Sequence, residues 1–353
     1  MARVLMKGNE AVAEAALRAG ADAYYGYPIT PQSEIAEYMS REMPLRGRSF
    51  LQTESEVATI NMVWGAGAAG ARVITSSSGP GISLMQEGIS YMCAGRVPGV
   101  IVDMMRLGPG PGNLQGAQDD YITCVKGGGN GTYKVICLAP ATLQEAIQLV
   151  SDAFDLADKY TNPVIFLADG MIGQMMEAVD FDLLKTNPPP EKPWALRGRH
   201  GGPKKVISAM ARGHVNYYAA NWENEQSRYP AMEKEVRYEA SNLEDAELVF
   251  VAYGSSARMA KYAAGKLRGE GVRVGLIRPI TLWPFPHAAF DQIGPRCKAV
   301  IVPELTIIGQ MIEDVQISAA GRWPVFHVGN QQTRPMNPSD VVKAAHEVLG
   351  GAK

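Results

Sequence analysis

Apolar residues recur along the first half of the chain with two different periods. Apolar side chains at helical spacing predict helices at 9–20, 32–42, 54–70, 83–93 and 142–160. Short, nearly continuous apolar runs predict strands at 73–76, 99–104, 135–138 and 163–167, while 24–31 is rich in turn formers and 107–131 reads as a glycine-rich loop. This alternating order predicts a parallel α/β sheet covered by helices on both faces.

The pattern changes after residue 185. Residues 186–241 contain three consecutive prolines, a Gly-Gly-Pro step and a polar stretch with little periodicity, which indicates a connector long enough to wrap a neighbour. Alternation resumes with strands predicted at 248–253, 272–276 and 298–303, a helix at 256–270 and a loop at 279–286. We therefore expect two open, mostly parallel α/β domains at 1–185 and 244–353, joined by an extended connector at 186–243.

Composition and charge narrow the function classes. The chain has 353 residues, 46% of them hydrophobic, and its 34 basic and 36 acidic residues nearly cancel to a net charge of −2. Such a balance offers no broad field to attract nucleic acid or an anionic membrane. The first ten residues lack the apolar core of a secretory signal, and no stretch reaches the roughly 18 apolar residues of a membrane span. We expect a cytoplasmic protein that binds neither nucleic acid nor membrane.

Motifs typical of phosphate and metal sites each lack an essential part. The G-x-G-x-x-G at 65–70 closes a helix instead of opening one, so close helix packing explains its glycines better than a dinucleotide site. The Ala-Asp-Gly at 168–170 lacks the first glycine and the downstream asparagine of a Mg²⁺-diphosphate motif, and 127–131 lacks the Lys-Ser/Thr of a phosphate loop. The four cysteines form no C-x-x-C pair and fit buried thiols better than zinc or cluster ligands. The sequence predicts no metal or diphosphate site in this chain.

Two polar residues near predicted helix starts have both a structural and a chemical interpretation. Thr30 places a hydroxyl at a strand-to-helix junction, facing a crevice, but it can also be a helix N-cap with Pro31 at the first helical position. Glu56 follows Thr53 by three residues, which is the spacing of a capping box. A buried glutamate can instead hydrogen-bond N1′ of an aminopyrimidine and promote the imino tautomer that deprotonates a thiazolium carbon.

Arg106 follows the apolar strand predicted at 99–104 and precedes a Gly-Pro-Gly-Pro-Gly run. This places its guanidinium at the carboxyl edge of a parallel sheet, where ligands of open α/β sheets bind. A planar fork of donors at that edge suits a carboxylate. The alternative is an ordinary surface arginine on a loop.

Five segments in the same order resemble the α subunits of 2-oxoacid:ferredoxin oxidoreductases. They are GYPITP at 26–31, ESE at 54–56, TSSSGPG at 75–81, MRLGP at 105–109, and PFP at 284–286 with PEL at 303–305 and GQ at 309–310. The resemblance spans nearly the whole chain. It implies that the first domain is a thiamine pyrimidine-binding domain and that the second is a transketolase C-terminal-like domain.

The resemblance also implies roles for the candidate residues. Glu56 would be catalytic and contact the aminopyrimidine of thiamine diphosphate, while Thr30 and Arg106 would face the carbonyl and the carboxylate of a 2-oxoacid. In this family the cofactor is shared with a diphosphate-binding β subunit. Mg²⁺ and iron-sulfur clusters lie in partner subunits, which include a γ subunit and a ferredoxin-like δ subunit, and none is bound by this chain.

The implied reaction is oxidative decarboxylation of a 2-oxoacid with coenzyme A, which yields an acyl-CoA, CO₂ and reduced ferredoxin. The DGMIGQMME stretch at 169–177 is similar to branched-chain (3-methyl-2-oxobutanoate) and 2-oxoglutarate members. We favour the branched-chain acid because no second basic residue stands near Arg106, although folding could bring in Lys126. Pyruvate, a non-oxidative thiamine enzyme subunit and an inactive scaffold paralogue remain alternatives.

Overall fold

The structure, a computed structural model, describes residues 3–210, 219 and 222–351. Its first sheet has eight strands, seven of them in the order β13-β7-β8-β5-β4-β2-β3. The parallel strands are β2 (Ala23–Gly26), β3 (Ser49–Gln52), β4 (Val73–Ser77), β5 (Gly99–Leu107), β7 (Ile136–Leu138) and β8 (Pro163–Asp169). β4 and β8 are buried throughout and β5 almost throughout, because both faces of the sheet are covered.

Helices cover this sheet on two sides, as the alternating pattern predicts. One apolar cluster joins the sheet to α1 (Gly8–Arg18), α2 (Ser33–Leu45) and α6 (Leu143–Tyr160). A second cluster joins the other face to α3 (Glu56–Ala68) and α4 (Pro80–Gly95). Two short helices, α5 (Tyr121–Val125) and α7 (Gly170–Gln174), complete the first domain. An antiparallel ribbon of β1 (Val4–Lys7) and β9 (Met176–Val179) belongs to it as well.

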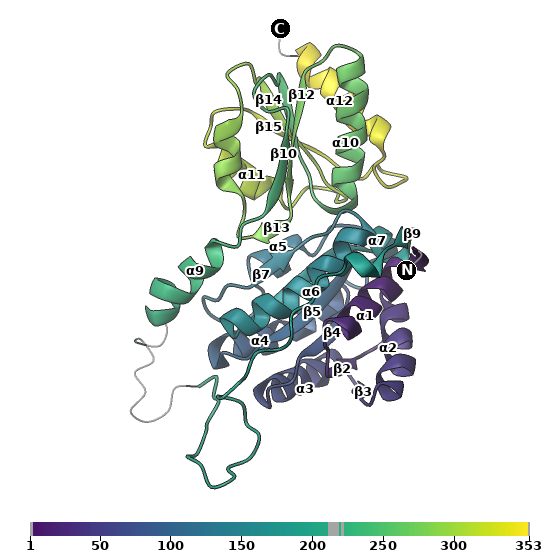
Figure 1. Ribbon diagram of the computed structural model, residues 1–353. Helices are drawn as coiled ribbons and strands as arrows, with labels where there is room; N and C mark the ends of the chain where they lie inside the picture. Colours follow the sequence, from purple (N-terminus) through teal and green to yellow (C-terminus); the bar gives the residue numbers. More distant parts are fainter. Residues whose placement is uncertain (1–2, 211–218, 220–221, 352–353) are drawn as a thin grey trace.

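The second domain is a five-stranded sheet in the order β10-β12-β11-β14-β15. Its strands are β10 (Tyr238–Ser241), β11 (Leu248–Val251), β12 (Val274–Pro279), β14 (Ala299–Pro303) and β15 (Val325–Val328), all parallel except β10. One cluster packs α10 (Gly254–Gly269) and α12 (Pro338–Gly351) on one face, and α11 (Ile312–Ala319) packs on the other. The expected class, two mostly parallel α/β domains, is confirmed (Figure 1).

The sequence pattern and the structure differ in short strands and in two helices of the second domain, α11 and α12, which were not predicted. The loop expected at 279–286 contains β13 (Thr281–Trp283), which pairs antiparallel with β7 of the first sheet. Residues 24–31 begin with the end of β2, β3 was not expected, and the 107–131 loop contains β6 (Asn113–Gly116) and α5. Strands of three or four residues are too short to display a period, so tertiary pairing decides them.

The connector expected at 186–243 first runs along the first domain, where the amide of Leu196 donates to the carbonyl of Ala68 at 2.9 Å, and then forms a loop that extends beyond it (bottom of Figure 1). Its described part then forms a π-helical turn (Asn224–Arg228) and α9 (Tyr229–Glu233), and its last residues form β10 of the second sheet. Residues 211–218 and 220–221 lie outside the described residues. The boundaries 1–185, 186–243 and 244–353 stay predictions.

Gln118 fastens the two domains together. This buried side chain donates from Nε2 to the carbonyl of Tyr253 (3.0 Å) and accepts at Oε1 from the amide of Leu305 (2.8 Å) and the hydroxyl of Ser256 (2.6 Å). One apolar cluster also runs continuously through both domains. The segment that follows β5 therefore has a fixed position between them.

Candidate active site

The carboxyl ends of neighbouring parallel strands bring the candidate residues to one edge of the first sheet. Thr30 follows β2, Glu56 follows β3 and Arg106 lies near the end of β5. Residues 77–81, which link β4 to α4, lie among them. This is the edge at which open α/β sheets bind ligands.

Glu56 is the first residue of α3, and it is 6% exposed. The N-cap of this helix is Ser55, whose hydroxyl accepts from the amide of Ala58 at 3.2 Å, so the capping-box interpretation of Thr53 and Glu56 is wrong. Thr53 instead shares a short hydrogen bond with the hydroxyl of Thr59. Glu56 is therefore buried without a capping function.

The helix start at Gly81 fits closely around the Glu56 carboxylate. A methyl group added to Gly81 would lie 2.5 Å from Glu56 Oε1 and would overlap the hydroxyl of Ser77. Three hydroxyls at the end of β4 and just after it, those of Thr75, Ser77 and Ser78, are buried without a hydrogen-bond partner within the described chain. Burying a polar group without a partner costs about 1–3 kcal/mol, so binding of a polar molecule that pairs with these hydroxyls is favoured.

Arg106 is 8% exposed, so the surface-loop interpretation of this arginine is wrong. Its Nη1 donates to the backbone carbonyl of Thr30 at 2.9 Å, and its buried Nε has no partner within the described chain. Gly79, at φ 46°, lies against the arginine: an added Cβ would be in ordinary contact with Arg106 Cγ at 3.5 Å. The guanidinium is held by one hydrogen bond and keeps donors for a ligand.

Thr30 is not a helix cap. The N-cap of α2 is Gln32, which makes no side-chain capping bond, and the helix starts at Ser33, so the expectation that Thr30 caps the helix is wrong. The side chain of Thr30 is exposed while its carbonyl anchors Arg106. The structure thus joins Thr30 to Arg106 through the backbone.

Three aspartates beside Arg106 were missed from the sequence. Asp120 Oδ2 accepts from the amide of Gly79 at 3.2 Å, and Asp119 Oδ2 accepts from the amide of Gly108 at 2.8 Å. Asp103, on β5, is fully buried and accepts at Oδ2 from the thiol of Cys124 (3.4 Å). For Asp119 and Asp120 the only signal was their adjacency within the glycine-rich loop at 107–131, which a surface turn explains equally well.

Burial keeps Asp103 and Asp120 from ionising as readily as carboxylates in water. Burial raises the pKa of Asp120 to about 7, against the opposing effects of the Gly79 amide and the Arg106 charge. Burial and the charge of Asp120 raise the pKa of Asp103 well above its ordinary value. Ionisation of both carboxylates together is therefore disfavoured.

A pocket of about 520 Å³ opens at Arg106. Its lining contains one cationic side chain (Arg106), two carboxylates (Asp119 and Asp120) and the apolar side chains of Pro80, Leu84, Leu107 and Pro109. Burial raises the pKa of Asp119 in this wall. The pocket combines an anion-binding group with a mostly apolar wall.

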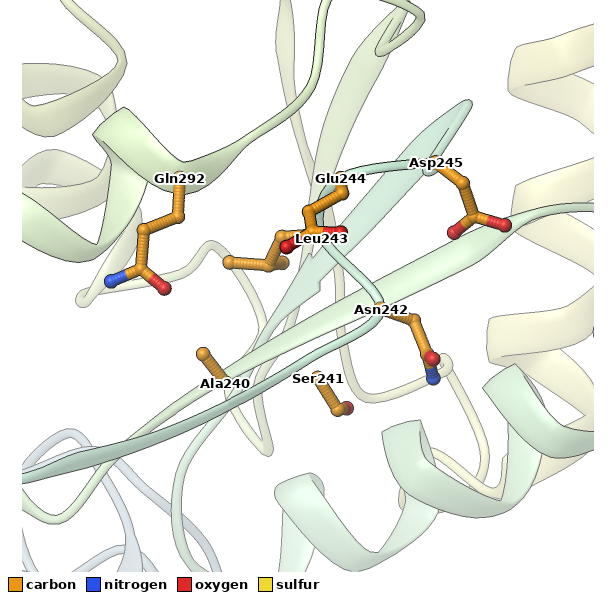
Figure 2. A pocket seen from close by; sticks show the side chains of 7 residues that line it. All are labelled: Ala240, Ser241, Asn242, Leu243, Glu244, Asp245 and Gln292. Atoms are coloured by element: carbon orange, nitrogen blue, oxygen red, sulfur yellow. The ribbon is translucent and has the colours of Figure 1, made fainter.

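A larger hollow, of about 600 Å³, lies on the second domain beside β10 and the following turn (Figure 2). Its side chains are Ala240, Ser241, Asn242, Leu243, Glu244, Asp245 and Gln292, none of which was a candidate. Asp245 already pairs with Arg268 at 2.6 Å. The hollow lies at an antiparallel edge strand and holds no cationic side chain, so it does not match the Arg106 pocket chemically.

The motifs set aside in the sequence have structural roles. Gly67, in the G-x-G-x-x-G run, packs so that an added Cβ would lie 2.5 Å from the carbonyl of Pro98. Asp169 accepts from the amides of Ile172 (3.2 Å) and Ser255 (2.8 Å), and all four cysteines are free and buried. Among the described residues, no group of three or more His, Cys, Asp or Glu side chains is placed to hold a metal. None of the described helices is long and apolar enough to cross a membrane.

Comparison with protein families and curated proteins gives matches over nearly the whole chain. Residues 14–242 match the pyruvate flavodoxin/ferredoxin oxidoreductase, thiamine diphosphate-binding model, and residues 246–341 match pyruvate:ferredoxin oxidoreductase core domain II. Ketoisovalerate oxidoreductase subunit VorB of Methanothermobacter marburgensis is 46% identical over 99% of both chains. 2-Oxoglutarate synthase subunit KorA of Methanocaldococcus jannaschii is 36% identical, over 88% of this chain and 90% of its own length.

Solved structures show the same architecture. A 2-oxoglutarate:ferredoxin oxidoreductase from Magnetococcus marinus, with 2-oxoglutarate, coenzyme A and succinyl-CoA bound, matches with a TM-score of 0.87 and 26% identity. The match covers 98% of this chain and 65% of that one. A split-gene transketolase, an inactive β4 tetramer, matches with a TM-score of 0.61 and 15% identity, which is a likeness of fold alone.

Proposed function

We propose, from the premise that this chain belongs to the 2-oxoacid:ferredoxin oxidoreductase family, that it supplies the pyrimidine-and-substrate side of a thiamine diphosphate site shared with a partner subunit. The observation that carries the proposal is the buried Glu56 carboxylate fitted against Gly81, at the same sheet edge as Arg106. The implied reaction converts a 2-oxoacid and coenzyme A to an acyl-CoA, CO₂ and reduced ferredoxin.

The residues around Glu56 fit the pyrimidine end of the cofactor. The close contacts at Gly81 leave no room for a larger side chain at this position. The hydroxyls of Ser77 and Ser78, which have no partner within the described chain, are available to a bound polar ring. When bound, thiamine diphosphate supplies the carbanion chemistry of decarboxylation. Glu56 would hold the proton at N1′ of the pyrimidine, and its burial keeps water from competing for that proton.

Arg106 is proposed to bind the carboxylate of the 2-oxoacid. Its Nη1 is anchored on the Thr30 carbonyl, so the edge of the guanidinium that carries the partner-free Nε and Nη2 forms a fork that is already oriented, and little ordering is required when the substrate arrives. Thr30 anchors the fork through its carbonyl, and its exposed side chain stands at the same edge, where it is proposed to face the substrate carbonyl. These are the groups that position the acid for decarboxylation.

The apolar wall of the pocket supports a branched-chain acid. Leu84 and Leu107 suit an isopropyl group, and Lys126, which could have received a second carboxylate, is paired with Asp314. The 46% identical relative is named for ketoisovalerate, whereas the 36% identical relative is named for 2-oxoglutarate. We therefore propose 3-methyl-2-oxobutanoate as the preferred substrate.

We propose a diphosphate-binding β subunit, a γ subunit and a ferredoxin-like δ subunit as partners, with Mg²⁺ and the iron-sulfur clusters bound there. Two observations support this division: all four cysteines of the chain are separately buried, and Asp169, which ends β8, is already occupied by two backbone amides. The relatives are themselves named as subunits. A cytoplasmic location is part of the same proposal.

The test is oxoacid-dependent ferredoxin reduction by the assembled complex. We expect a brown complex that reduces ferredoxin with coenzyme A and 3-methyl-2-oxobutanoate, with lower kcat/KM for 2-oxoglutarate and pyruvate. Glu56→Gln should abolish most of this activity, while Glu54→Gln, an exposed neighbour on the same turn, should not. A colourless active complex, or equal activity of Glu56→Gln and the control, would refute the proposal.

A further inference from the structure

We propose that Asp119 is a specificity-determining residue, which disfavours dicarboxylate 2-oxoacids in the pocket that Arg106 heads. The inference rests on the proposed function. It assigns a cause to a preference that the fold alone does not explain, since relatives acting on ketoisovalerate and on 2-oxoglutarate match along nearly the same length.

The charge distribution of the pocket is asymmetric. Among the described lining residues Arg106 is the one cation. It would pair with the carboxylate that every 2-oxoacid carries next to its carbonyl. The remaining ionisable lining groups, Asp119 and Asp120, are both acidic. A second carboxylate at the far end of the substrate would therefore meet like charge, and none of the described residues that line the pocket supplies a counter-ion for it.

Asp119 is better placed than Asp120 for this effect. Asp120 is 9% exposed, and burial raises its pKa to about 7, so its charged form is disfavoured. Asp119 is only half-buried, and within the described chain its carboxylate is engaged at Oδ2 alone, by the amide of Gly108. Burial raises the pKa of Asp119, and the hydrogen bond from this amide opposes that shift by favouring the ionised form. Asp119 thus presents its carboxylate to the pocket.

Its position is fixed by both domains. The side chain of Gln310, from the second domain, donates to the backbone carbonyl of Asp119 at 2.6 Å, and the amide of Gly108 holds the carboxylate at 2.8 Å. With its backbone held by Gln310 and one carboxylate oxygen held by the Gly108 amide, Asp119 keeps a fixed orientation toward the pocket. Because it is fixed, it can discriminate between substrates, which a flexible surface charge in water would do far less well.

The experiment compares kcat/KM for 2-oxoglutarate and 3-methyl-2-oxobutanoate in the assembled complex. Asp119→Asn keeps an acceptor for the Gly108 amide and removes the charge, and Asp119→Ser is a second variant with a smaller side chain. We expect the ratio of kcat/KM for 2-oxoglutarate over the branched-chain acid to rise about 10- to 100-fold. Asp119→Lys should raise it further, because it adds a counter-ion.

The matched control is Asp291→Asn, which removes a carboxylate that is 73% exposed and paired with Arg322 on the second domain. It should leave the ratio unchanged. A merely structural role of Asp119 would lower both kcat/KM values together, so an unchanged ratio in active Asp119→Asn and Asp119→Ser complexes overturns the inference. A wild-type complex that prefers 2-oxoglutarate also overturns it, but leaves the family activity intact. A wild-type complex that uses no 2-oxoacid overturns the proposed function itself.

Discussion

Replacing Gly81 by alanine is expected to disturb the proposed cofactor site through a single methyl group. The added carbon would lie 2.5 Å from Glu56 Oε1, about 1 Å short of the roughly 3.5 Å of a good non-bonded contact, and would also overlap Ser77. Both neighbours are buried and Gly81 opens a helix, so the clash cannot be relieved by a flexible surface side chain. Overpacking of this kind costs about 1–3 kcal/mol.

If this cost falls on the oriented Glu56 carboxylate, it converts to a loss of about 5- to 150-fold in thiamine diphosphate affinity or in kcat. The assay is the activation of cofactor-depleted complex by added thiamine diphosphate, which gives an apparent affinity and a maximal rate. The melting temperature of the same complex shows whether it remains assembled. For Gly81→Ala we expect a lower apparent affinity for thiamine diphosphate and a lower maximal rate. The melting temperature should change less than these two values.

Gly65→Ala is the matched control, since Gly65 is also a helical glycine and an added Cβ there meets nothing within 4 Å. This change should stabilise α3 by about 0.5–1 kcal/mol, because alanine loses less conformational entropy than glycine in a helix. The reasoning is refuted if Gly81→Ala and Gly65→Ala show the same cofactor affinity and the same kcat.

Four further predictions concern other residues. Glu56→Gln should lower kcat by at least about 100-fold with little change in melting temperature, and a kcat within threefold of wild type would contradict its acid-base role. Arg106→Leu should lower kcat/KM for the oxoacid by about 10- to 150-fold, since a charged hydrogen bond is lost; an unchanged kcat/KM would remove Arg106 from the site. Burial raises the pKa of Glu304 to about 7, so its contribution to stability is present below about pH 4.5 and should be lost as the pH rises to 7. In Glu304→Gln the melting temperature should therefore depend less on pH over this range than in the wild type. Equal pH dependence of the two melting temperatures would contradict this. Arg72→Met should destabilise the chain by about 3–5 kcal/mol, because the buried guanidinium binds Asp158 at 2.8 Å; an unchanged melting temperature would contradict this.

The long elements could be predicted because their patterns repeat. The helix predicted at 142–160 is observed as α6, and the strand predicted at 163–167 is observed as β8 with two more residues. α6 has eighteen residues, so its apolar face repeats over several turns and single polar exceptions do not hide the helical period. β13 has three residues, and its pairing with β7 is decided by contacts more than a hundred residues apart in the chain.

Local motifs were predictable only up to a choice between alternatives. The spacing Thr-x-x-Glu occurs at 53–56 and at 142–145, and only the second is a helix cap: Thr142 accepts from the amide of Glu145 at 3.2 Å. At the first position Ser55 has that role, which leaves Glu56 for other chemistry. The two cases differ by the neighbouring residue that competes for the cap, and spacing does not contain that information.

The acidic side of the pocket could not be predicted, because it is built by long-range contacts. Asp119 and Asp120 belong to a segment that no period marks as helix or strand, and their partners Gly108 and Gly79 lie on two other loops. The sequence placed Arg106 at the sheet edge from the strand before it, but only folding brings these carboxylates beside it. The order of strands was therefore enough to predict the position of Arg106, but not the carboxylates that surround it.

Asp169 lies where a metal-binding carboxylate could be expected, but it has a structural role. It ends a parallel strand, the position from which a carboxylate can reach a metal or a diphosphate. Here its two oxygens accept from the amides of Ile172 and Ser255, so the carboxylate caps α7 and fastens the second domain to the first. The carboxylate that remains at the sheet edge without such a duty is Glu56, which agrees with a chain that presents one half of a shared site.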